Sequence, residues 1–459
     1  MLRTVITKTK YEKTCAYLED KFAELENDGS FFAFVSTEYD RKGNAVHDLF
    51  DIIEKAVSLG YQYINTIVYP TENVRYYSTA DNVRYVVWLC KNRREVRFDK
   101  DVIREKHIWK DVEWGKRTKN YNPKGKDPGN VWIPTNDDGK AHITEHILLS
   151  DEDVKSRLLK MTECGNDFEI YWDETAAGEE KAFPSHNLGG KKAEHAEGRV
   201  YFKSSETMNE LSSGEIKMAV TSPPYWNLKD YFKEGQIGQE EYGEYLRRME
   251  IVWKNCFDKL SEQGSLWINI NIRVHDGKVI PIPGDIVKMC KKIGFFYKGI
   301  IIWHKSSGIP TGDKNIVDRH EYVLIFSKCE DFNITSAQKK YCDYKNDAMN
   351  GGSFWNINRK AGSVGKKFIH PAIYPNELTN RIIEMTTERG ETVLDPFLGS
   401  GTTMISSMAM GRNCVGYEYN EGFEELIKSR LENELKEGYK ISRRTIGQNC
   451  SESYLFCGM

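Results

Sequence analysis

The segment Thr392-Val393-Leu394-Asp395-Pro396-Phe397-Leu398-Gly399-Ser400-Gly401-Thr402-Thr403 decides the fold. It predicts an apolar strand that runs into an acid, a glycine-rich turn, and a helix from about Thr402 to Met410. Glycines let the backbone approach a ligand closely, and a helix N-terminus offers free N–H groups. Further on, Val415-Gly416-Tyr417-Glu418 ends a second strand with an acid that can accept hydrogen bonds from ribose hydroxyls. This order favours an α/β sheet with a ligand at its strand ends.

Two other nucleotide-binding patterns fit this segment less well. A phosphate-binding loop is excluded because Gly-Lys followed by Ser or Thr is absent from the turn. A nicotinamide-binding turn is disfavoured because the turn reads Asp-Pro-Phe-Leu-Gly-Ser-Gly instead of Gly-x-Gly-x-x-Gly.

A second strand end with unusual chemistry lies earlier in the chain. The short apolar strand Met218-Ala219-Val220 runs into Thr221-Ser222-Pro223-Pro224-Tyr225-Trp226. Two consecutive prolines fix φ near −65° and remove two backbone donors, so the turn is stiff before any ligand binds. A hydroxyl, bare carbonyl groups and an aromatic ring are thus held at the carboxyl end of a strand, where open α/β sheets bind ligands. Alone, this segment would be read as an ordinary Pro-Pro turn.

Together the two segments resemble the DNA amino-methyltransferases, which methylate exocyclic amines with S-adenosylmethionine. Ser222-Pro223-Pro224-Tyr225 matches the catalytic tetrapeptide of that family, and Asp395–Thr403 matches its cofactor loop Asp-Pro-Phe-x-Gly-Ser-Gly-Thr-Thr. His370-Pro371-Ala372-Ile373-Tyr374-Pro375 resembles the family's His-x-Ala-x-Phe-Pro element, which lines the methionine end of the cofactor. The catalytic motif precedes the cofactor loop, as in the family's β group. The resemblance covers about residues 198–430.

The resemblance implies a fold and a set of site residues. The fold is α/β and Rossmann-like, a mixed and mostly parallel sheet with helices on both faces. The implied catalytic residues are Ser222, Pro223, Pro224 and Tyr225. The implied cofactor-binding residues are Asp395, Pro396, Phe397, Gly399, Ser400, Gly401, Thr402, Thr403, Glu418, His370, Pro371 and Tyr374. No metal is expected. One departure is that Val200–Ser205 lacks the acid that contacts the cofactor adenine in the family, so that contact is not carried over.

The identity of position 222 bears on the target base. A Ser-Pro-Pro-Tyr tetrapeptide resembles family members that act on the 4-amino group of cytosine, whereas Asp-Pro-Pro-Tyr is typical of adenine enzymes. The prediction is a methyl transfer to cytosine in double-stranded DNA, by base flipping and direct in-line transfer. Methylation of the 6-amino group of adenine is the alternative. An RNA or protein methyltransferase and a non-catalytic, cofactor-binding regulator or scaffold remain open.

The chain also contains two copies of one pattern. The matched segments, in the same order, are 25–32 with 260–267, 51–63 with 285–297, 85–91 with 322–328, 131–132 with 354–355, and 157–162 with 381–386. The alternative to a duplication is that these segments match only because α/β proteins commonly reuse helix-turn-strand patterns. We favour an internal duplication, with a degenerate copy in residues 1–190, a catalytic copy in 195–430 and a C-terminal tail in 431–459. The polar stretch 175–192 is the linker expected between them.

The first copy is expected to have lost its site. Asn122–Trp132 resembles a stretch of the family, but four acids crowd the turn in Tyr171–Glu180, where the cofactor loop would lie. The tetrapeptide is absent from residues 1–190, and we expect the chain to begin downstream of its place. This copy should neither bind cofactor nor catalyse. It would instead supply the partner of a pseudo-dimer within a monomer and help to contact DNA.

Composition limits the partners. The chain has 459 residues and a net charge of −3, which excludes a wholly basic nucleic-acid coat. Residues 91–126 contain 13 Lys or Arg and 6 Asp or Glu with Trp109, Trp114 and Tyr121 interleaved, which fits either a phosphate-tracking face or a solvated helix face. The loop from Arg359 to Lys367 is a second basic segment.

The same composition bears on the surroundings of the chain. Ten scattered cysteines form no Cys-x-x-Cys pair, and no apolar run is long enough for a membrane span. We expect a cytoplasmic protein with no membrane contact. A cognate restriction endonuclease is a further possible partner.

Overall fold

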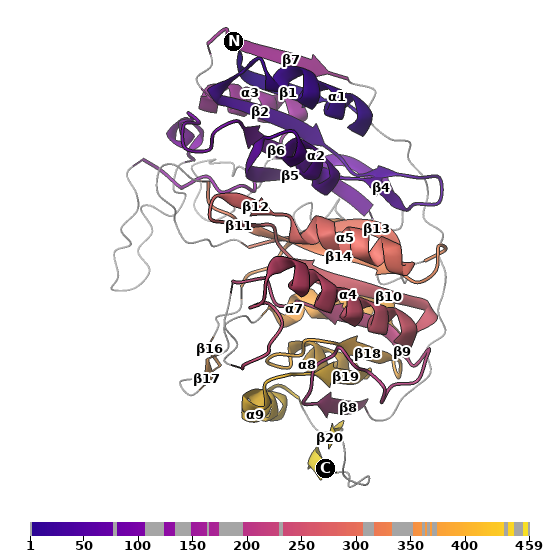
Figure 1. Cartoon of the computed structure of the whole chain (residues 1–459). Helices are drawn as coiled ribbons and strands as arrows, with labels where there is room; N and C mark the ends of the chain where they lie inside the picture. The colour runs from indigo at the N-terminus through magenta and orange to yellow at the C-terminus, as the bar shows by residue number, and fades with distance from the viewer. Residues whose placement is uncertain are drawn as a thin grey trace, which may run out of the picture.

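The computed structural model has two stacked lobes (Figure 1). It describes residues 2–76, 80–105, 124–133, 148–162, 165–173, 196–228, 233–305, 316–332, 352–359, 363–364, 368–369, 374–435, 439–444 and 453–457. We call residues 2–173 the N-terminal lobe and residues 196–457 the C-terminal lobe. Each lobe is built on its own sheet, of five and ten described strands respectively.

The C-terminal lobe holds a mixed sheet in the order β15-β13-β14-β10-β9-β18-β19-β8-β20-β21. Its strands are β8 (Ala196–Tyr201), β9 (Ile216–Thr221), β10 (Leu260–Ile270), β13 (Phe296–His304), β14 (His320–Ser327), β15 (Phe354–Asn356), β18 (Thr392–Asp395), β19 (Asn413–Tyr417), β20 (Tyr439–Arg444) and β21 (Ser453–Cys457). Only β14 and β21 run antiparallel to their neighbours. The sheet is therefore mostly parallel, as predicted.

Helices cover both faces of this sheet. They are α4 (Tyr242–Lys259), α5 (Ile282–Ile293), α7 (Asn376–Thr386), α8 (Thr402–Ala409) and α9 (Glu424–Glu434). Side chains of β9 alternate between faces: Ala219 belongs to the apolar cluster of α4 and α5, whereas Met218 and Val220 belong to the cluster of α7. Burial on both faces explains why the strands read as continuous apolar runs. The predicted Rossmann-like α/β architecture is confirmed.

Short elements complete the C-terminal lobe. They are the hairpin β11 (Arg273–His275) and β12 (Lys278–Ile280), the hairpin β16 (Ser363–Val364) and β17 (Phe368–Ile369), and the 3-10 turn η3 (Glu421–Phe423). Among the described residues, no helix combines the length and apolarity needed to cross a membrane.

The N-terminal lobe repeats the central part of this topology. Its elements are β1 (Leu2–Lys8), α1 (Tyr11–Phe22), β2 (Leu25–Val35), β3 (Glu38–Tyr39), β4 (Ala45–His47), α2 (Leu49–Ser58), β5 (Gln62–Tyr76), β6 (Ala80–Cys90), η1 (Lys100–Ile103), α3 (Asp151–Thr162) and β7 (Phe168–Trp172). The strand order β5-β6-β2-β1-β7 has the same relative directions as β13-β14-β10-β9-β18. The helices α1 and α2 share one apolar cluster, and α3 packs on the opposite face.

The strand registers correct one expectation about the N-terminal lobe. Thr4 of β1 lies between β2 and β7, as Met218 of β9 lies between β10 and β18. Counting on along both strands, Lys8 takes the position of Ser222. The place of the tetrapeptide therefore lies within the chain, after β1, and the expectation that the chain begins downstream of it is wrong.

The expected C-terminal tail at 431–459 is also wrong. The helix α9 continues to Glu434, and β20 and β21 extend the sheet beside β8. Strand β20 runs parallel to β8 from Tyr439 to Arg444, so these residues belong to the C-terminal lobe. The expected linker, 175–192, lies outside the described residues.

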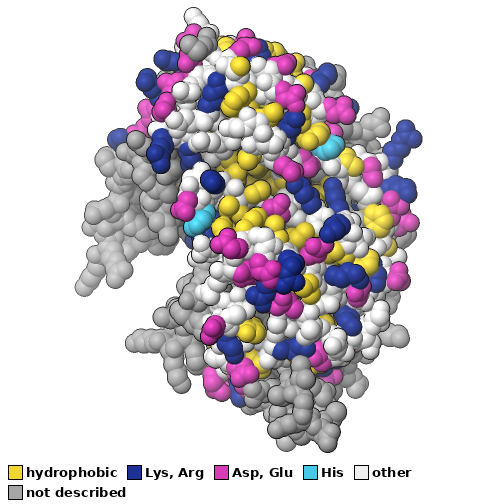
Figure 2. Space-filling view, viewed as in Figure 1, with side chains coloured by type: hydrophobic (Ala, Val, Ile, Leu, Met, Phe, Trp, Pro, Cys, Tyr) yellow, Lys and Arg dark blue, Asp and Glu magenta, His cyan; other side chains and the backbone are white. Residues whose placement is uncertain are grey.

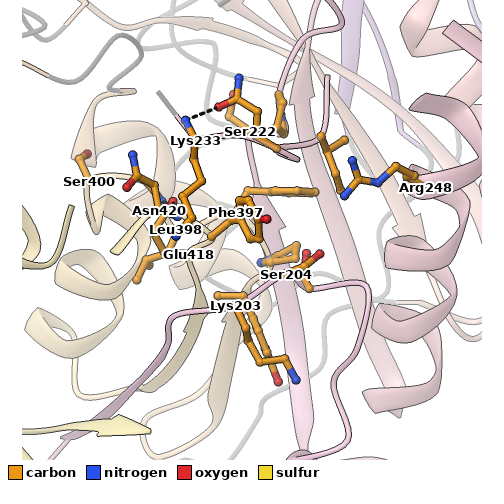
Figure 3. A pocket seen from close by; sticks show the side chains of 18 of the residues that line it. Lys203, Ser204, Ser222, Lys233, Arg248, Phe397, Leu398, Ser400, Glu418 and Asn420 are labelled. Carbon is orange, nitrogen blue, oxygen red and sulfur yellow. Dashed lines mark hydrogen bonds between the residues drawn. The ribbon is translucent and has the colours of Figure 1, made fainter. Parts of the chain in front are cut away.

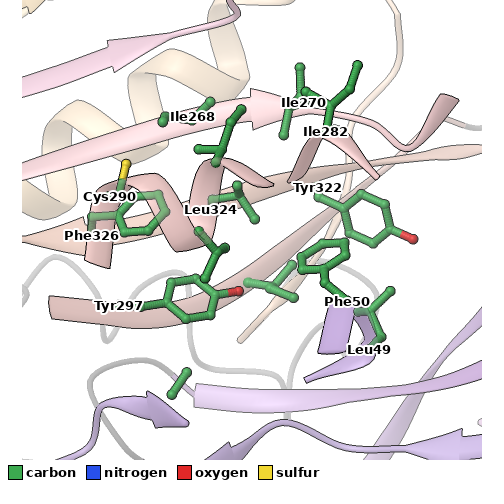
Figure 4. Close-up of a cluster of buried hydrophobic side chains, with 14 of the residues drawn as sticks. Leu49, Phe50, Ile268, Ile270, Ile282, Cys290, Tyr297, Tyr322, Leu324 and Phe326 are labelled. Atoms are coloured by element: carbon green, nitrogen blue, oxygen red, sulfur yellow. The ribbon is translucent and has the colours of Figure 1, made fainter. Parts of the chain in front are cut away.

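The two lobes share one hydrophobic core. Figure 4 shows Leu49 and Phe50 of α2 beside Tyr297 of β13 and Tyr322 of β14. The rings of Phe50 and Tyr322 pack edge to face, with centroids 5.1 Å apart. The Tyr297 hydroxyl donates across the interface to buried Asp48, at 2.8 Å. The lobes are therefore joined by buried contacts rather than by surface charge alone.

Candidate active site

The two motifs meet because their strands are neighbours. Strands β9 and β18 pair in parallel, with Met218 opposite Val393 and Ala219 opposite Leu394. Their carboxyl ends therefore open at the same edge of the sheet. A cavity lies there, with about 850 Å³ of space including its open mouth (Figure 3). It is lined by Lys203, Ser204, Ser205, Ser222, Pro224, Lys233, Gly235, Gln236, Ile237, Arg248, Tyr374, Pro396, Phe397, Leu398, Gly399, Ser400, Thr402, Tyr417, Glu418, Tyr419 and Asn420.

Most of the predicted site residues lie on or directly behind the wall of this cavity. On the wall are Ser222, Pro224, Tyr374, Pro396, Phe397, Gly399, Ser400, Thr402 and Glu418. Pro223, Tyr225, Asp395, Gly401 and Thr403 are neighbours in sequence but are not part of the lining. His370 and Pro371 lie outside the described residues.

The carboxylate of Asp395 is buried behind the cofactor loop, not exposed to the cavity. It accepts hydrogen bonds from the Phe397 backbone N–H (3.0 Å), the Thr403 hydroxyl (2.6 Å) and the Tyr374 hydroxyl (3.1 Å). Burial raises the pKa of Asp395, and these donors oppose that rise. Asp395 therefore ties the strand end, the loop and the start of α8 together, and its influence on a ligand is exerted through the loop.

A buried arginine donates hydrogen bonds to the glycine-rich loop. Arg430 of α9 is fully buried, and its guanidinium donates to the Ser400 carbonyl (2.9 Å), the Ser400 hydroxyl (2.7 Å) and the Thr402 hydroxyl (2.8 Å). Gly401 precedes α8 with φ of 83°, a left-handed conformation that favours glycine. The helix α8 spans Thr402–Ala409, close to the predicted range.

Glu418 follows β19 and faces the same loop. One carboxylate oxygen accepts from the Gly399 N–H at 2.8 Å, and the other accepts from the Asn420 N–H at 2.7 Å. Burial raises the pKa of Glu418 to about 7. The side chain is half-buried and lines the cavity, and a carboxylate has about four acceptor sites in all, so its backbone donors do not exhaust it. Glu418 can thus accept a hydrogen bond from a ligand hydroxyl.

The tetrapeptide is anchored by side chains of neighbouring elements. The Tyr245 hydroxyl of α4 donates to the Pro224 carbonyl at 3.0 Å. The Tyr225 hydroxyl donates to Glu321 of β14 at 2.7 Å. The amide nitrogen of Asn269, on β10, lies 3.4 Å from the Ser222 hydroxyl. The strand end is therefore fixed by its own prolines and by three neighbouring elements.

Sequence reasoning missed two parts of the cavity wall. Lys203, Ser204 and Ser205 follow β8, which lies beside β19 in the sheet. This is the segment set aside because it lacks the acid of the family. Lys233, Gly235, Gln236 and Ile237 come from the loop before α4, and Arg248 comes from α4 itself. The positive φ of Gly235 and Gly238 marks a turn there, which a Gly-x-x-Gly spacing could have suggested.

The predicted DNA-contacting segments are only partly described. Trp109, Trp114 and Tyr121 lie outside the described residues, as does most of the loop from Arg359 to Lys367. Several described cations of the basic stretch are engaged within the chain, since Lys100 pairs with Asp127 and both Arg104 and Lys124 pair with Asp101. On the face drawn in Figure 2, positive and negative side chains are intermingled.

Comparisons with known proteins identify the family of the chain. Residues 216–429 match the family model described as DNA methylase. A relative from Methanothermobacter thermautotrophicus, type II methyltransferase M.MthZI, is 32% identical over 313 residues, which are 56% of this chain and 86% of the relative. The chain belongs to the DNA methylase family and is a DNA amino-methyltransferase. It takes its methyl group from S-adenosylmethionine, as predicted from the sequence.

Two further proteins are similar to the chain. The type II methyltransferase M.SmaI of Serratia marcescens is 29% identical over 261 residues, covering 49% of this chain and 87% of the relative. The solved structure of PvuII DNA methyltransferase (cytosine-N4-specific) is 21% identical, with a TM-score of 0.42, and covers 54% of this chain and 98% of that chain.

The residues around the cavity fit this cofactor. Glu418 has free acceptor capacity for ribose hydroxyls, and the apolar Pro396, Phe397 and Ile237 offer surface for a flat ring. The fit uses only residues that are present. The acid that contacts the cofactor adenine in the family is absent from Val200–Ser205, before β9, and plays no part in it.

Proposed function

We propose that this enzyme methylates the exocyclic 4-amino group of cytosine in double-stranded DNA. The observation that carries the proposal is that Ser222 lines the same cavity as the cofactor loop. A hydroxyl at this position resembles the cytosine-specific members of the family, whereas a carboxylate is typical of adenine enzymes. Methylation of the 6-amino group of adenine is the second candidate.

The chain must make a poor nucleophile reactive. The lone pair of the exocyclic amine is delocalised into the ring, so acceptors for the amine protons favour a tetrahedral nitrogen. Ser222 Oγ and the Pro223 carbonyl oxygen are the acceptors that we assign to this role. Stacking of the base on Tyr225 would contribute about 1–3 kcal/mol.

The target amine has to leave the duplex to reach this cavity, because the stacked base hides it. We therefore assign base flipping to this enzyme. When bound, S-adenosylmethionine supplies an electrophilic methyl group for direct transfer. Direct transfer needs no covalent enzyme intermediate, and no described cysteine lines the cavity.

The experiment is a methylation assay with the full chain, labelled S-adenosylmethionine and duplex DNA. Digestion to nucleosides and mass spectrometry should show N4-methylcytosine. N6-methyladenine instead would transfer the proposal to adenine. Label in parallel RNA or protein samples, with none in DNA, would reject a DNA target. Cofactor binding without any transfer would point to a regulator or scaffold.

We also propose that the N-terminal lobe is a degenerate duplicate that acts as a built-in partner of the catalytic lobe. The contacts between the lobes are reciprocal. Helix α2 packs on α5, its topological equivalent. Strand β4 contacts β13, while β12 contacts β5. Such exchange of equivalent contacts is the mark of an isologous, two-fold interface.

Hydrogen bonds from backbone N–H groups to side chains repeat the same reciprocity. The N–H of Asn82 donates to the Ser353 hydroxyl at 3.1 Å, and the N–H of Arg319 donates to the Asn130 amide oxygen at 2.8 Å. By strand register, Asn82 is the equivalent of Arg319. By the sequence match, Asn130 is the equivalent of Ser353. A monomeric solution mass would support the intramolecular pseudo-dimer, and a symmetric dimer formed through the C-terminal lobe would count against it.

The cofactor site of the N-terminal lobe is proposed to be lost. By strand register Ile170 takes the place of Asp395, which removes the carboxylate that ties the loop. Lys8, at the place of Ser222, is bound to Asp151 at 2.6 Å and lies over the Trp172 ring. We infer that one cofactor binds per chain, which calorimetric titration would measure.

The relatives named as type II methyltransferases suggest the biological setting. We propose that the enzyme modifies one short sequence in the cytoplasm and protects it from a cognate restriction endonuclease. Mapping modified bases in the host genome tests this. Complete modification of a single short sequence would support protection, and scattered partial modification would oppose it.

A further inference from the structure

We propose that Glu321 is a positioning residue for the methyl transfer, which holds the Tyr225 side chain and the Asn269 amide at the end of β9. The inference rests on the proposed role of Tyr225 and extends it to a residue that lies 96 positions away in sequence.

The contacts of Glu321 form one connected network. One carboxylate oxygen accepts both the Tyr225 hydroxyl and the Asn269 amide nitrogen, each at 2.7 Å. The other oxygen accepts the Lys305 ammonium at 2.8 Å. The Asn269 nitrogen also lies 3.4 Å from the Ser222 hydroxyl. A single carboxylate therefore connects to both functional side chains of the tetrapeptide.

The network crosses four neighbouring strands at the edge where the cavity opens. Lys305 follows β13, Glu321 is the second residue of β14, Asn269 lies near the end of β10, and Ser222 follows β9. These strands are consecutive in the sheet order. A rigid sheet fixes all four positions, which is how a positioning network reaches the precision that catalysis requires.

The carboxylate is held in its charged form. The side chain of Glu321 is 17% exposed and that of Lys305 is 7% exposed. Burial opposes ionisation, but the Lys305 charge and the hydrogen bonds from Lys305, Tyr225 and Asn269 outweigh it and lower the pKa of Glu321. Charge-assisted hydrogen bonds are stronger than neutral ones, so the ionised carboxylate of Glu321 is a strong acceptor for the Tyr225 hydroxyl.

The N-terminal lobe provides an internal comparison. By strand register the equivalents of Glu321 and Asn269 are Arg84 and Phe34. Continuing the register of β13 beyond its end places Thr71 at the equivalent of Lys305. The lobe without a Ser-Pro-Pro-Tyr segment thus also lacks every member of the network. The network and the Ser-Pro-Pro-Tyr segment are thus present together in one lobe and absent together from the equivalent positions of the other.

The test is a double-mutant cycle of Glu321→Gln and Tyr225→Phe in the full chain. Glu321→Gln should lower kcat by about tenfold to hundredfold, because the ring of Tyr225 loses its fixed position. The KM for DNA should change by less than about threefold, since phosphate contacts dominate DNA affinity. The cofactor Kd should be unchanged, because Glu321 is not part of the cavity lining. In the double variant kcat should fall no further than in the worse single variant.

Two controls keep the outcome unambiguous. Glu262→Gln removes a carboxylate that is 90% exposed and should leave kcat unchanged. If Glu321→Gln fails to fold because Lys305 is left without a counter-charge, Glu321→Gln with Lys305→Met removes both charges and takes its place in the cycle.

The inference is overturned if Glu321→Gln keeps wild-type kcat, or if the effects of the two substitutions multiply in the double variant. Failure of the proposed function looks different, because the wild-type enzyme itself would then leave cytosine unmethylated.

Discussion

Removing the hydroxyl of Ser222 tests its proposed role as an acceptor for the protons of the target amine. Ser222→Ala keeps the prolines and the cavity but removes one acceptor for the amine protons. Loss of one such group from a preorganised site costs about 10²–10³-fold in kcat. Single-turnover methyl transfer at saturating cofactor should show this loss. A rate equal to that of the wild type would remove Ser222 from the mechanism.

Glu418 gives the cofactor site a pH dependence. Its pKa of about 7 means that the carboxylate is mostly protonated at pH 6 and mostly ionised at pH 8. The ionised form accepts hydroxyl donors more strongly, so cofactor affinity should rise by up to about tenfold over that range. Glu418→Gln should bind more weakly than the wild type at pH 8 and show a flat profile in calorimetric titration. An equal pH dependence in the variant would mean that another group titrates.

The same pKa shift has the opposite effect on the ligand-free fold. The pKa of Glu418 is raised above its ordinary value of 4.5, so the folded state retains the proton more readily than the unfolded chain. The stability from this group is present below pH 4.5 and is lost as the pH rises through about 7. We compare the melting temperature of Glu418→Gln with that of the wild type, both without cofactor. The difference, variant minus wild type, should be larger at pH 8 than at pH 5.

At this scale the sequence predicted residues within motifs and missed residues that meet them in space. Ser222, Pro396 and Glu418 stand in recognisable local patterns at strand ends, and they line the cavity. Glu321 stands in an ordinary apolar strand, and Gln236 in an ordinary loop. Nothing local distinguishes them, because their roles depend on which strands become neighbours.

Among the elements, the contact between β19 and the cofactor loop should be sensitive to added volume. A Cβ atom at Gly416 would lie 2.5 Å from Cδ2 of Leu398, a loop residue whose N–H donates to the Tyr417 carbonyl. Gly416→Ala should therefore shift the loop and cost about 1–3 kcal/mol of stability, with weaker cofactor binding. Thermal unfolding and calorimetric titration measure the two effects.

Gly243 supplies the matched control. It lies in the first turn of α4, with no neighbouring heavy atom within 4 Å of an added Cβ. Gly243→Ala should leave cofactor affinity unchanged and stabilise the helix by about 0.5–1 kcal/mol. Equal losses of affinity in both variants would show that the loop contact is not the cause.

The elements themselves were predictable where hydrophobic runs and turn residues coincide. The start of α8 after Gly401 and the strand Asn413–Tyr417 follow directly from sequence. A less predictable element is β2 (Leu25–Val35), which contains Gly29. The pairing of β2 with β1 shifts there, from Leu25 opposite Leu2 to Ser30 opposite Thr4, so Gly29 lies in an irregular stretch of the strand, where an added Cβ would be 2.9 Å from the backbone carbonyl of Arg3.

At the scale of the whole molecule, the sequence did not predict which distant segments pair as neighbouring strands. Strand β20 pairs with β8, more than 200 residues earlier, and its sequence Tyr439–Arg444 is too polar to suggest a place in a sheet. Strand β1 similarly became a central strand only because β7 pairs along its other side. Both corrections concern which strands are neighbours, and local propensity carries no information on that.

The shared core predicts that the two lobes unfold together. Phe50 of α2 is buried against Tyr322 of β14, and its Cβ would lie 3.1 Å from a Cβ added at Gly284 of α5. Phe50→Ala should create a cavity between the lobes and lower the free energy of unfolding by about 3–5 kcal/mol. One apolar cluster contains residues of both lobes, such as Val5 and Leu266. The whole calorimetric transition should therefore move to lower temperature as one peak.

Val57→Ala on the same helix is the control for Phe50→Ala, since Val57 is 41% exposed and its truncation should change stability by less than about 0.5 kcal/mol. If Phe50→Ala instead splits the transition and leaves one peak at the wild-type temperature, the lobes are independent folding units. The N-terminal lobe would then be an attached domain, and its reciprocal contacts would not serve to hold the catalytic sheet in shape. A single displaced peak means that the N-terminal lobe contributes directly to the stability of the C-terminal lobe.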